Sequence, residues 1–180
     1  MLKILDDACT PKRGTKYSAY VDLFAREDVV VGAGDTKIVP LGVKLDLEKL
    51  YQKWFIYTEQ NKINESWSFF LSSHYLEIAL RSSLGVKGLV IANGKGVVDL
   101  DYEGEIGLIV HNPITAIDAY VENIDGDVWS DYVGAGADNS FKIKKGDKVC
   151  QCTLKEHKSY LMGYESDNIR SGGYGSTNNE

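Results

Sequence analysis

The sequence predicts a mainly β fold, either a sandwich or a jelly-roll-like barrel of short strands, with one helical insertion. Three observations support this prediction. Short runs of β-branched residues recur along the 180-residue chain, and turn signals made of Gly, Asp and Asn separate them. One segment instead carries apolar residues at helical spacing. The length fits a single domain, and the apolar fraction of 43% is sufficient for a core.

The first half of the chain is predicted to contain strands at Val29–Val31, Lys37–Val39 and Gly42–Leu45. A helix then follows, because apolar residues recur at i, i+3, i+4, i+7 and i+8 after an N-cap aspartate at Asp46. The residues of this stripe are Leu47, Leu50, Tyr51, Trp54 and Phe55. We expect the stripe to pack rather than to bind a ligand. It belongs to an insertion, about residues 46–74, that covers part of the barrel.

The second half predicts further strands. They are Tyr75–Leu80, Ile106–Val110, Phe141–Lys144 and, after the turn 145–148, Val149–Leu154. A second insertion, about residues 119–139, is interpreted as a surface loop anchored by Trp129 and Tyr132. Its Asp125-Gly126-Asp127 sequence lacks the full ligand spacing of a calcium loop. The tail 166–180 is either a disordered terminus or an arm that orders on a ligand.

The net charge and the cysteines narrow the class of protein. A net charge of −6 argues against a duplex-binding protein, which needs a basic face, but not against an enzyme that acts on nucleotides. Without a long apolar run or a signal-peptide pattern, we expect a cytoplasmic protein. Cys9, Cys150 and Cys152 are interpreted as buried or half-buried free thiols. A metal site there would need more ligands than His157 supplies.

The most informative group of candidate ligand-binding and catalytic side chains lies between Arg81 and Glu105. Arg81-Ser82-Ser83 follows a strand end, and a guanidinium matches phosphate oxygens in a fork; the alternative is a surface turn with a structural arginine. Asp99 ends a short β-branched run, where a carboxylate can activate a water; the alternative is a turn aspartate. Tyr102 is expected near a hairpin tip, where its ring can cover one face of a sugar. Together these groups suit a ligand with several phosphates and a polar base.

Five segments of the sequence resemble the motifs of one protein family. They are 18–23 (Ser-Ala-Tyr-Val-Asp-Leu), 81–84 (Arg-Ser-Ser-Leu), 93–102 from Asn93 to Tyr102, 146–151 (Gly-Asp-Lys-Val-Cys-Gln) and 170–177 from Arg170 to Thr177. In this order, over nearly the whole chain, they resemble the five motifs of the trimeric dUTP diphosphatase (dUTPase) family. The resemblance implies a dUTPase-like β domain at residues 1–165 and a flexible arm at 166–180 that closes the active site. It also implies a homotrimer whose sites are assembled from three chains.

The resemblance also implies roles for individual residues. Asp99 would orient the water that attacks the α-phosphorus of dUTP, which gives dUMP and pyrophosphate. Asn93 would read the uracil edge with nearby backbone, and Tyr102 would pack under the deoxyribose and exclude a 2′-hydroxyl. Mg²⁺ would bridge the phosphates with mostly water ligands, close to Asp22. The remaining substrate-binding residues implied are Arg81, Ser82, Ser83, Gly96, Val98, Gln151, Arg170, Tyr174, Gly175, Ser176 and Thr177.

The chain departs from the family pattern at several positions. Tyr20 stands where the family has Gly, Leu80 replaces a Pro, and Tyr174 replaces the usual Phe that stacks on the base. The fifth motif is one residue shorter between Arg170 and Tyr174, so the role of Arg170 stays open. The two insertions resemble those of some phage dUTPases, in which an insert contacts a partner protein; a phage protein would act in the host cytoplasm.

Three alternatives remain. A dCTP deaminase shares the fold and an Arg-Ser-Ser motif, but its deaminating Glu would fall here on an aliphatic residue after Gly104. A regulatory protein could act through its insertions, either with or without catalysis. A structural jelly-roll protein would not need the five motifs.

Overall fold

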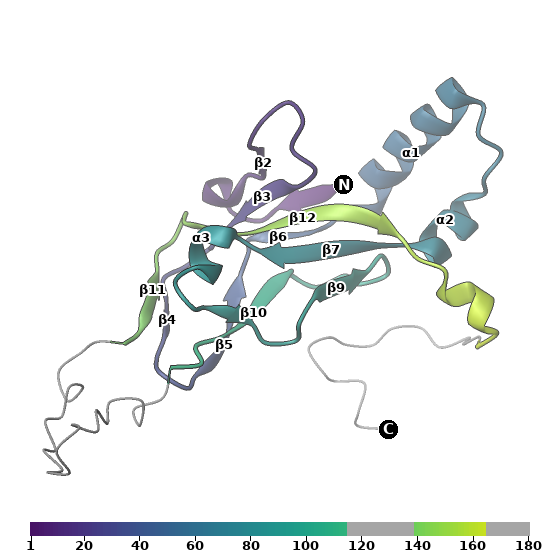
Figure 1. Cartoon of the computed structure of the whole chain (residues 1–180). Coiled ribbons are helices and arrows are strands. Elements are labelled where there is room, and N and C mark those ends of the chain that lie inside the picture. Colours follow the sequence, from purple (N-terminus) through teal and green to yellow (C-terminus); the bar gives the residue numbers. More distant parts are fainter. Residues whose placement is uncertain (115–138, 165–180) are drawn as a thin grey trace, which may run out of the picture.

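The computed structural model describes residues 1–114 and 139–164 (Figure 1). Its helices are α1 (Leu47–Asn61), α2 (Trp67–Ser73) and α3 (Ser82–Gly85), with 3-10 turns η1 (Asp7–Cys9) and η2 (Ser159–Met162). The strands are β1 (Leu2–Ile4), β2 (Lys12–Arg13), β3 (Val21–Phe24), β4 (Val29–Val31), β5 (Thr36–Pro40), β6 (Val43–Leu45), β7 (His74–Leu80), β8 (Val90–Ile91), β9 (Gly96–Asp99), β10 (Gly107–His111), β11 (Phe141–Ile143) and β12 (Lys148–Glu156).

The strands form antiparallel sheets, of which the largest has the order β2-β3-β12-β7-β9. A second sheet has the order β5-β10-β8, and β1-β6 and β11-β4 form two-stranded pairs. The fold is therefore mainly β with a helical insertion, as the sequence predicts. The predicted strands are all found, within two residues at either end. β1, β2, β3 and β8 were not predicted, because runs of two to four residues carry little periodicity.

The core lies on one face of the five-stranded sheet. Leu23, Ile78, Cys150 and Cys152 are fully or almost fully buried in a single apolar cluster. Neighbouring residues of a strand point to opposite faces, so Asp22, Glu77 and Gln151 lie on the other face. The prediction of buried free thiols is confirmed at all three cysteines.

The predicted helix is confirmed as α1, and the Asp46 carboxylate caps it by accepting a hydrogen bond of 3.0 Å from the Lys49 N–H. The packing of its stripe was only partly predicted. Leu50 is buried against Phe70 and Leu100, but Leu47, Tyr51 and Phe55 are each more than a third exposed.

The sequence analysis missed α2, whose N-cap Ser66 accepts a hydrogen bond from the Phe69 N–H. Trp67 of α2 packs against Tyr51 and Trp54 of α1, with ring centroids 5.2 and 5.3 Å apart. The insertion thus has an aromatic cluster of its own, and α1 projects away from the barrel (Figure 1). The insertion lies beside the barrel only where α1 begins and α2 ends (Figure 1).

The predicted loop at 119–139 lies, except for Asn139, outside the described residues, and so does the tail 166–180. No helix among the described residues is long and apolar enough to cross a membrane.

Candidate functional site: a pocket with two cations and a distant carboxylate

The pairing register of the five-stranded sheet brings three sequence motifs together. Asp22 on β3 lies directly opposite Gln151 on β12, and both point away from the core. Arg81 follows the end of β7, where its N–H donates to the Val149 carbonyl at 3.1 Å. The three side chains come from segments far apart in the sequence, and antiparallel pairing places them at one end of one sheet face.

These residues line a pocket of about 460 Å³. Its walls come from β3 and the loop before it, the end of β7, and β12. The lining residues are Gly14, Thr15, Ser18, Ala19, Tyr20, Asp22, Arg81, Ser82, Lys148 and Gln151. Arg81, Ser82 and Gln151 were predicted as phosphate ligands, whereas Lys148 was interpreted only as part of a turn. The pocket therefore holds two cations and several neutral donors.

Asp22 is the buried anion of this pocket. Its Oδ1 pairs with the Arg81 guanidinium, and its Oδ2 lies 3.2 Å from Lys148 Nζ. Burial by itself raises the pKa of Asp22, but the hydrogen bonds from Lys148 and Arg81 outweigh burial and lower the pKa below its usual value. Asp22 therefore stays ionised and fixes both cations at the pocket.

A magnesium ion at this pocket would find few protein ligands. Within residues 1–114 and 139–164, no group of three or more His, Cys, Asp or Glu side chains is arranged to hold a metal. Both oxygens of Asp22 are already paired with cations. Such a donor set fits Mg²⁺ that keeps most of its water and is held chiefly by phosphates, which is a common mode of magnesium binding.

Ser82 and Ser83 lie at the start of α3 rather than in the predicted loop. Arg81 is the N-cap residue, with extended backbone, and both serines are exposed. One helical turn therefore follows the strand directly and presents the two hydroxyls beside Arg81. The prediction that β7 ends at Leu80 is confirmed.

Asp99 lies in a different place. It ends β9 opposite Tyr75 of β7, exposed on the same sheet face as the phosphate pocket. It lines a second pocket of about 420 Å³, which the insertion, β7 and the end of β12 help to form. Its lining residues are Leu47, Ser68, Leu71, Ser72, His74, Asp99, Leu100, Asp101 and His157.

The two pockets are separated along β7. Asp99 pairs with Tyr75, and Arg81 lies six residues further along the same segment. At about 3.3 Å per residue, this places Asp99 roughly 20 Å from Arg81. Within one chain, the side chains of Arg81 and Asp99 therefore lie at opposite ends of β7 and do not form one compact cluster.

Asn93 lies in an exposed turn between β8 and β9, next to Gly94, which has a positive φ of 71°. Gly96 lies opposite Ile78, and a Cβ at Gly96 would lie 2.8 Å from the Ile78 Cβ, so only glycine fits there. The Val98 side chain packs against the core. Only its backbone can therefore reach a ligand.

Tyr102 is close to Asp99 because its N–H donates to the Asp99 carbonyl at 3.1 Å, which closes a turn. The expected hairpin tip is wrong: β9 pairs with β7, whereas β10 pairs with β5 and β8. The Tyr102 hydroxyl donates to the Glu105 carbonyl at 3.1 Å. Its ring lies over Gly104, where any Cβ would collide with it. The ring is thus held by its own loop.

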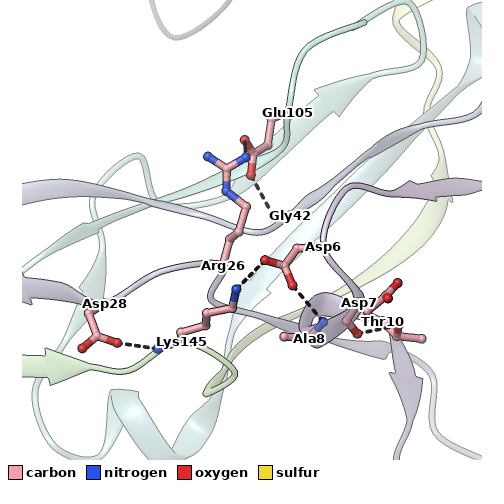
Figure 2. A network of polar contacts seen from close by, with 9 residues as sticks. All are labelled: Asp6, Asp7, Ala8, Thr10, Arg26, Asp28, Gly42, Glu105 and Lys145. Atoms are coloured by element: carbon pink, nitrogen blue, oxygen red, sulfur yellow. Dashed lines mark hydrogen bonds and ion pairs between the residues drawn. The ribbon is translucent and has the colours of Figure 1, made fainter.

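Glu105 anchors this loop to the barrel (Figure 2). Its Oε1 accepts a hydrogen bond of 2.8 Å from the Gly42 N–H, and its Oε2 lies 2.8 Å from the Arg26 guanidinium. The next residue, Ile106, is fully buried. The carboxylate that follows Gly104 is therefore used in structural contacts.

A buried carboxylate that the sequence analysis missed lies between the two pockets. Glu77 of β7 is 8% exposed and accepts hydrogen bonds from the hydroxyls of Tyr20 and Tyr75, the latter at 2.9 Å. Its Oε2 also lies 2.9 Å from Lys95 Nζ. The bond from Tyr20, followed by Lys95 and Tyr75, lowers the pKa of Glu77 to about 2 despite burial.

The predicted residues of the tail, Arg170 and Tyr174 to Thr177, lie outside the described residues. The structure therefore brings together Asp22, Arg81, Ser82 and Gln151, and separately Asp99 and Tyr102. Lys148, Tyr20 and Glu77 were missed as site residues, since their contacts arise between strands. An available signal was that Lys148 belongs to the fourth motif, three residues before Gln151.

No protein-family model matches the chain. Its sequence relatives include a deoxyuridine 5′-triphosphate nucleotidohydrolase of Rickettsia canadensis, 26% identical over 175 residues, which covers 93% of this chain and 86% of that protein. Another is an SPbeta prophage-derived deoxyuridine 5′-triphosphate nucleotidohydrolase of Bacillus subtilis. It is 27% identical over 179 residues, which covers 98% of this chain and 95% of the relative.

Solved structures with a similar fold include the dUTPase from Streptococcus mutans, with a TM-score of 0.56 and 23% identity over 86% of this chain and 94% of that one. The dUTPase of Staphylococcus bacteriophage 80alpha has a TM-score of 0.57 and 19% identity, covering 98% and 97%. A dUTPase from phage phi11 of S. aureus, in which a structural Mg(II) ion is coordinated, has a TM-score of 0.56 and 18% identity, covering 98% of each chain. These likenesses show the fold.

The low pKa of Glu77 gives a pH dependence of stability. The folded state lowers this pKa from 4.5 to about 2, so its contribution to stability is complete above the unfolded value and is lost as the pH falls from 4.5 towards 2. Between about pH 6 and about pH 3, we expect the free energy of unfolding of the natural protein to fall more than that of Glu77→Gln. Urea unfolding at fixed protein concentration measures both; equal losses would contradict the contribution of Glu77.

Proposed function

We propose that this chain, which belongs to the dUTPase family by sequence and fold, hydrolyses dUTP to dUMP and pyrophosphate. The observation that carries the proposal is the pocket at which Asp22, Arg81 and Gln151 meet. Three of the five family motifs converge there through strand pairing alone. The pocket supplies two cations and hydroxyl and amide donors, which suits a chain of phosphates.

The chemistry needs few groups. Hydrolysis of a phosphoanhydride depends mainly on positioning and on neutralising charge. Arg81 and Lys148 would bind phosphate oxygens, while the Ser82 and Ser83 hydroxyls and the Gln151 amide would donate hydrogen bonds. Asp99 would orient a water and accept its proton as the water oxygen bonds to the α-phosphorus, and pyrophosphate would leave. Mg²⁺, when bound through the phosphates, would neutralise further charge.

The nucleoside would bind along β9 and the turns at its two ends. Asn93 and the backbone at Gly96 and Val98 are suited to reading the uracil edge, and the fixed ring of Tyr102 to packing against deoxyribose. A 2′-hydroxyl or a cytosine amino group would be rejected by collision or by leaving polar groups unpaired.

The roughly 20 Å between Asp99 and Arg81 supports a site shared between chains. The Asp99 end of one chain would complete the Arg81 end of another, as a closed homotrimer allows. The tail from Arg170 to Thr177 would then cover the phosphates from a third chain. Tyr174 would stack on the base.

The alternatives are less well supported. A deaminase needs a glutamate at a position that is aliphatic here, and the nearby Glu105 is bound to Arg26 and Gly42. A protein-binding role for the insertions stays a prediction. The exposed side chains of Phe55, Ile56 and Tyr57 on α1 would be available for such a contact.

The function is tested by incubating the protein with Mg²⁺ and either dUTP or dCTP, and assaying for pyrophosphate and ammonia. We expect pyrophosphate from dUTP and neither product in quantity from dCTP. Ammonia from dCTP would support the deaminase instead.

Asp99→Asn should keep nucleotide binding but lower kcat on the order of 10²- to 10⁴-fold, because an amide cannot accept the proton of the water. Calorimetry with a non-hydrolysable dUTP analogue measures binding, and pyrophosphate release measures turnover. Asp35→Asn, at an exposed aspartate that lines neither pocket, is the matched control and should remain active. An active Asp99→Asn variant would remove the assigned role.

Mixed trimers test the shared site. Asp99→Asn and Arg81→Ala should each be inactive alone, but chains mixed under mild denaturation and refolded should recover activity. If each site takes Asp99 from one chain and Arg81 from another, random mixing makes about one site in four intact (½ × ½).

A double variant, Arg81→Ala with Asp99→Asn, mixed with Asp99→Asn serves as the control, since no intact site can form from it. The absence of recovery in the first mixture, with trimers confirmed by light scattering, would show that each chain works alone.

A further inference from the structure

Glu77 occupies a central and rigid position that the proposed chemistry does not use. It lies in the middle of β7, which is paired on both sides, with β12 and with β9. Its neighbours across the strands are Thr153 and Val97. The carboxylate therefore has a fixed location on the sheet face that joins the two pockets.

Burying a carboxylate there is costly unless it is fully bonded. Glu77 is fully bonded: it receives two phenol hydroxyls and one ammonium group. A well-packed apolar residue would often be at least as stable as such a buried ionic group. Stability alone is thus a weak explanation for Glu77, and its choice of partners is more informative.

One partner belongs to the turn that carries Asn93. Lys95 lies two residues after Asn93, and its N–H donates to the Asn93 carbonyl at 2.8 Å. Its Nζ lies 2.9 Å from Glu77, although the Lys95 side chain is 58% exposed. Because the turn is exposed and contains the flexible Gly94, this ion pair is its side-chain link to the sheet face.

The other partner belongs to the phosphate pocket. Tyr20 lines that pocket, and its hydroxyl donates to Glu77 Oε1. β3 and β7 are separated by β12, so the Tyr20 side chain crosses one strand to reach Glu77. In the resembled motif this position is a glycine, which has no side chain to make the contact.

We propose that Glu77 is a positioning residue that holds the base-reading turn through Lys95 and the wall of the phosphate pocket through Tyr20. This role rests on the proposed function, and it adds residues that set nucleoside and phosphate affinity separately. Lys95 thereby serves the turn rather than a phosphate. When sites are shared between chains, one Glu77 supports two neighbouring sites.

Three variants separate the link from Glu77 to the turn from the link to the pocket wall. Lys95→Met removes the ion pair to the turn, Tyr20→Phe removes one hydrogen bond to the pocket wall, and Glu77→Gln weakens both. Lys37→Met is the matched control, since Lys37 is a similarly exposed lysine that pairs with Asp35 at 3.7 Å on β5, away from both pockets. Inhibition constants for deoxyuridine and for inorganic pyrophosphate measure the two pockets separately, and hydrogen exchange measures the amides of residues 18–21 and 93–96.

We expect Lys95→Met to weaken deoxyuridine about tenfold and pyrophosphate little, the size expected for losing one hydrogen bond to a charged group. Tyr20→Phe should do the reverse, Glu77→Gln should weaken both, and Lys37→Met neither. Exchange should accelerate at 93–96 in Lys95→Met and at 18–21 in Tyr20→Phe, in each case more than at the other of these two segments.

The proposal would be overturned if Lys95→Met and Glu77→Gln showed the same hydrogen-exchange rates and inhibition constants as Lys37→Met. So would an equal loss for both ligands in every variant together with lower melting temperatures, which indicates a purely structural role. Failure of the natural protein to hydrolyse dUTP would instead refute the proposed function; the exchange measurements need no substrate and would still decide the positioning role.

Discussion

The arrangement of the molecule depends on the pairing register of β12 with β3 and β7. This register places Cys150 and Cys152 in the core and Gln151 beside Asp22 on the opposite face. Side chains alternate along a strand, so a slip of one residue would turn Gln151 into the core and both cysteines to the outer face. The apolar core thus fixes the phosphate pocket: the same contacts that exclude Cys150 from solvent align Asp22, Gln151 and Arg81.

Buried charge is tolerated on this face because each carboxylate is shared among segments. Asp22 holds Arg81 and Lys148, and Glu77 holds Tyr20, Tyr75 and Lys95. Both carboxyls keep a lowered pKa in spite of burial. Each is a fixed anion that orders side chains from segments far apart in the sequence. The energetic cost of burial is offset by the number of donors rather than by exposure to water.

The sequence predicted the local features of the structure. The strands, the Asp46 cap of α1 and the residues of the motifs follow from periodicity and from short patterns. The sequence could not predict contacts created by pairing. Glu77 looks like any polar residue of an alternating strand, and Lys148 like part of a Gly-Asp turn. Their roles arise only when β3, β7 and β12 are aligned. The helix α2 was missed because seven residues with four aromatic or leucine side chains do not distinguish a helix from a strand.

The distance between Asp99 and Arg81 has a consequence for how this fold can work. A rigid strand separates the two groups, and no rotation of side chains closes roughly 20 Å. Hinge motion would have to break β7 away from β12 or β9 and expose the core. In the homotrimer proposed above, association of copies would bring the two ends together without that cost, because the carboxylate of one chain would meet the cations of the next. Activity and assembly would then be one equilibrium, and a variant that weakens the contacts between copies would lower turnover even when each chain stays folded.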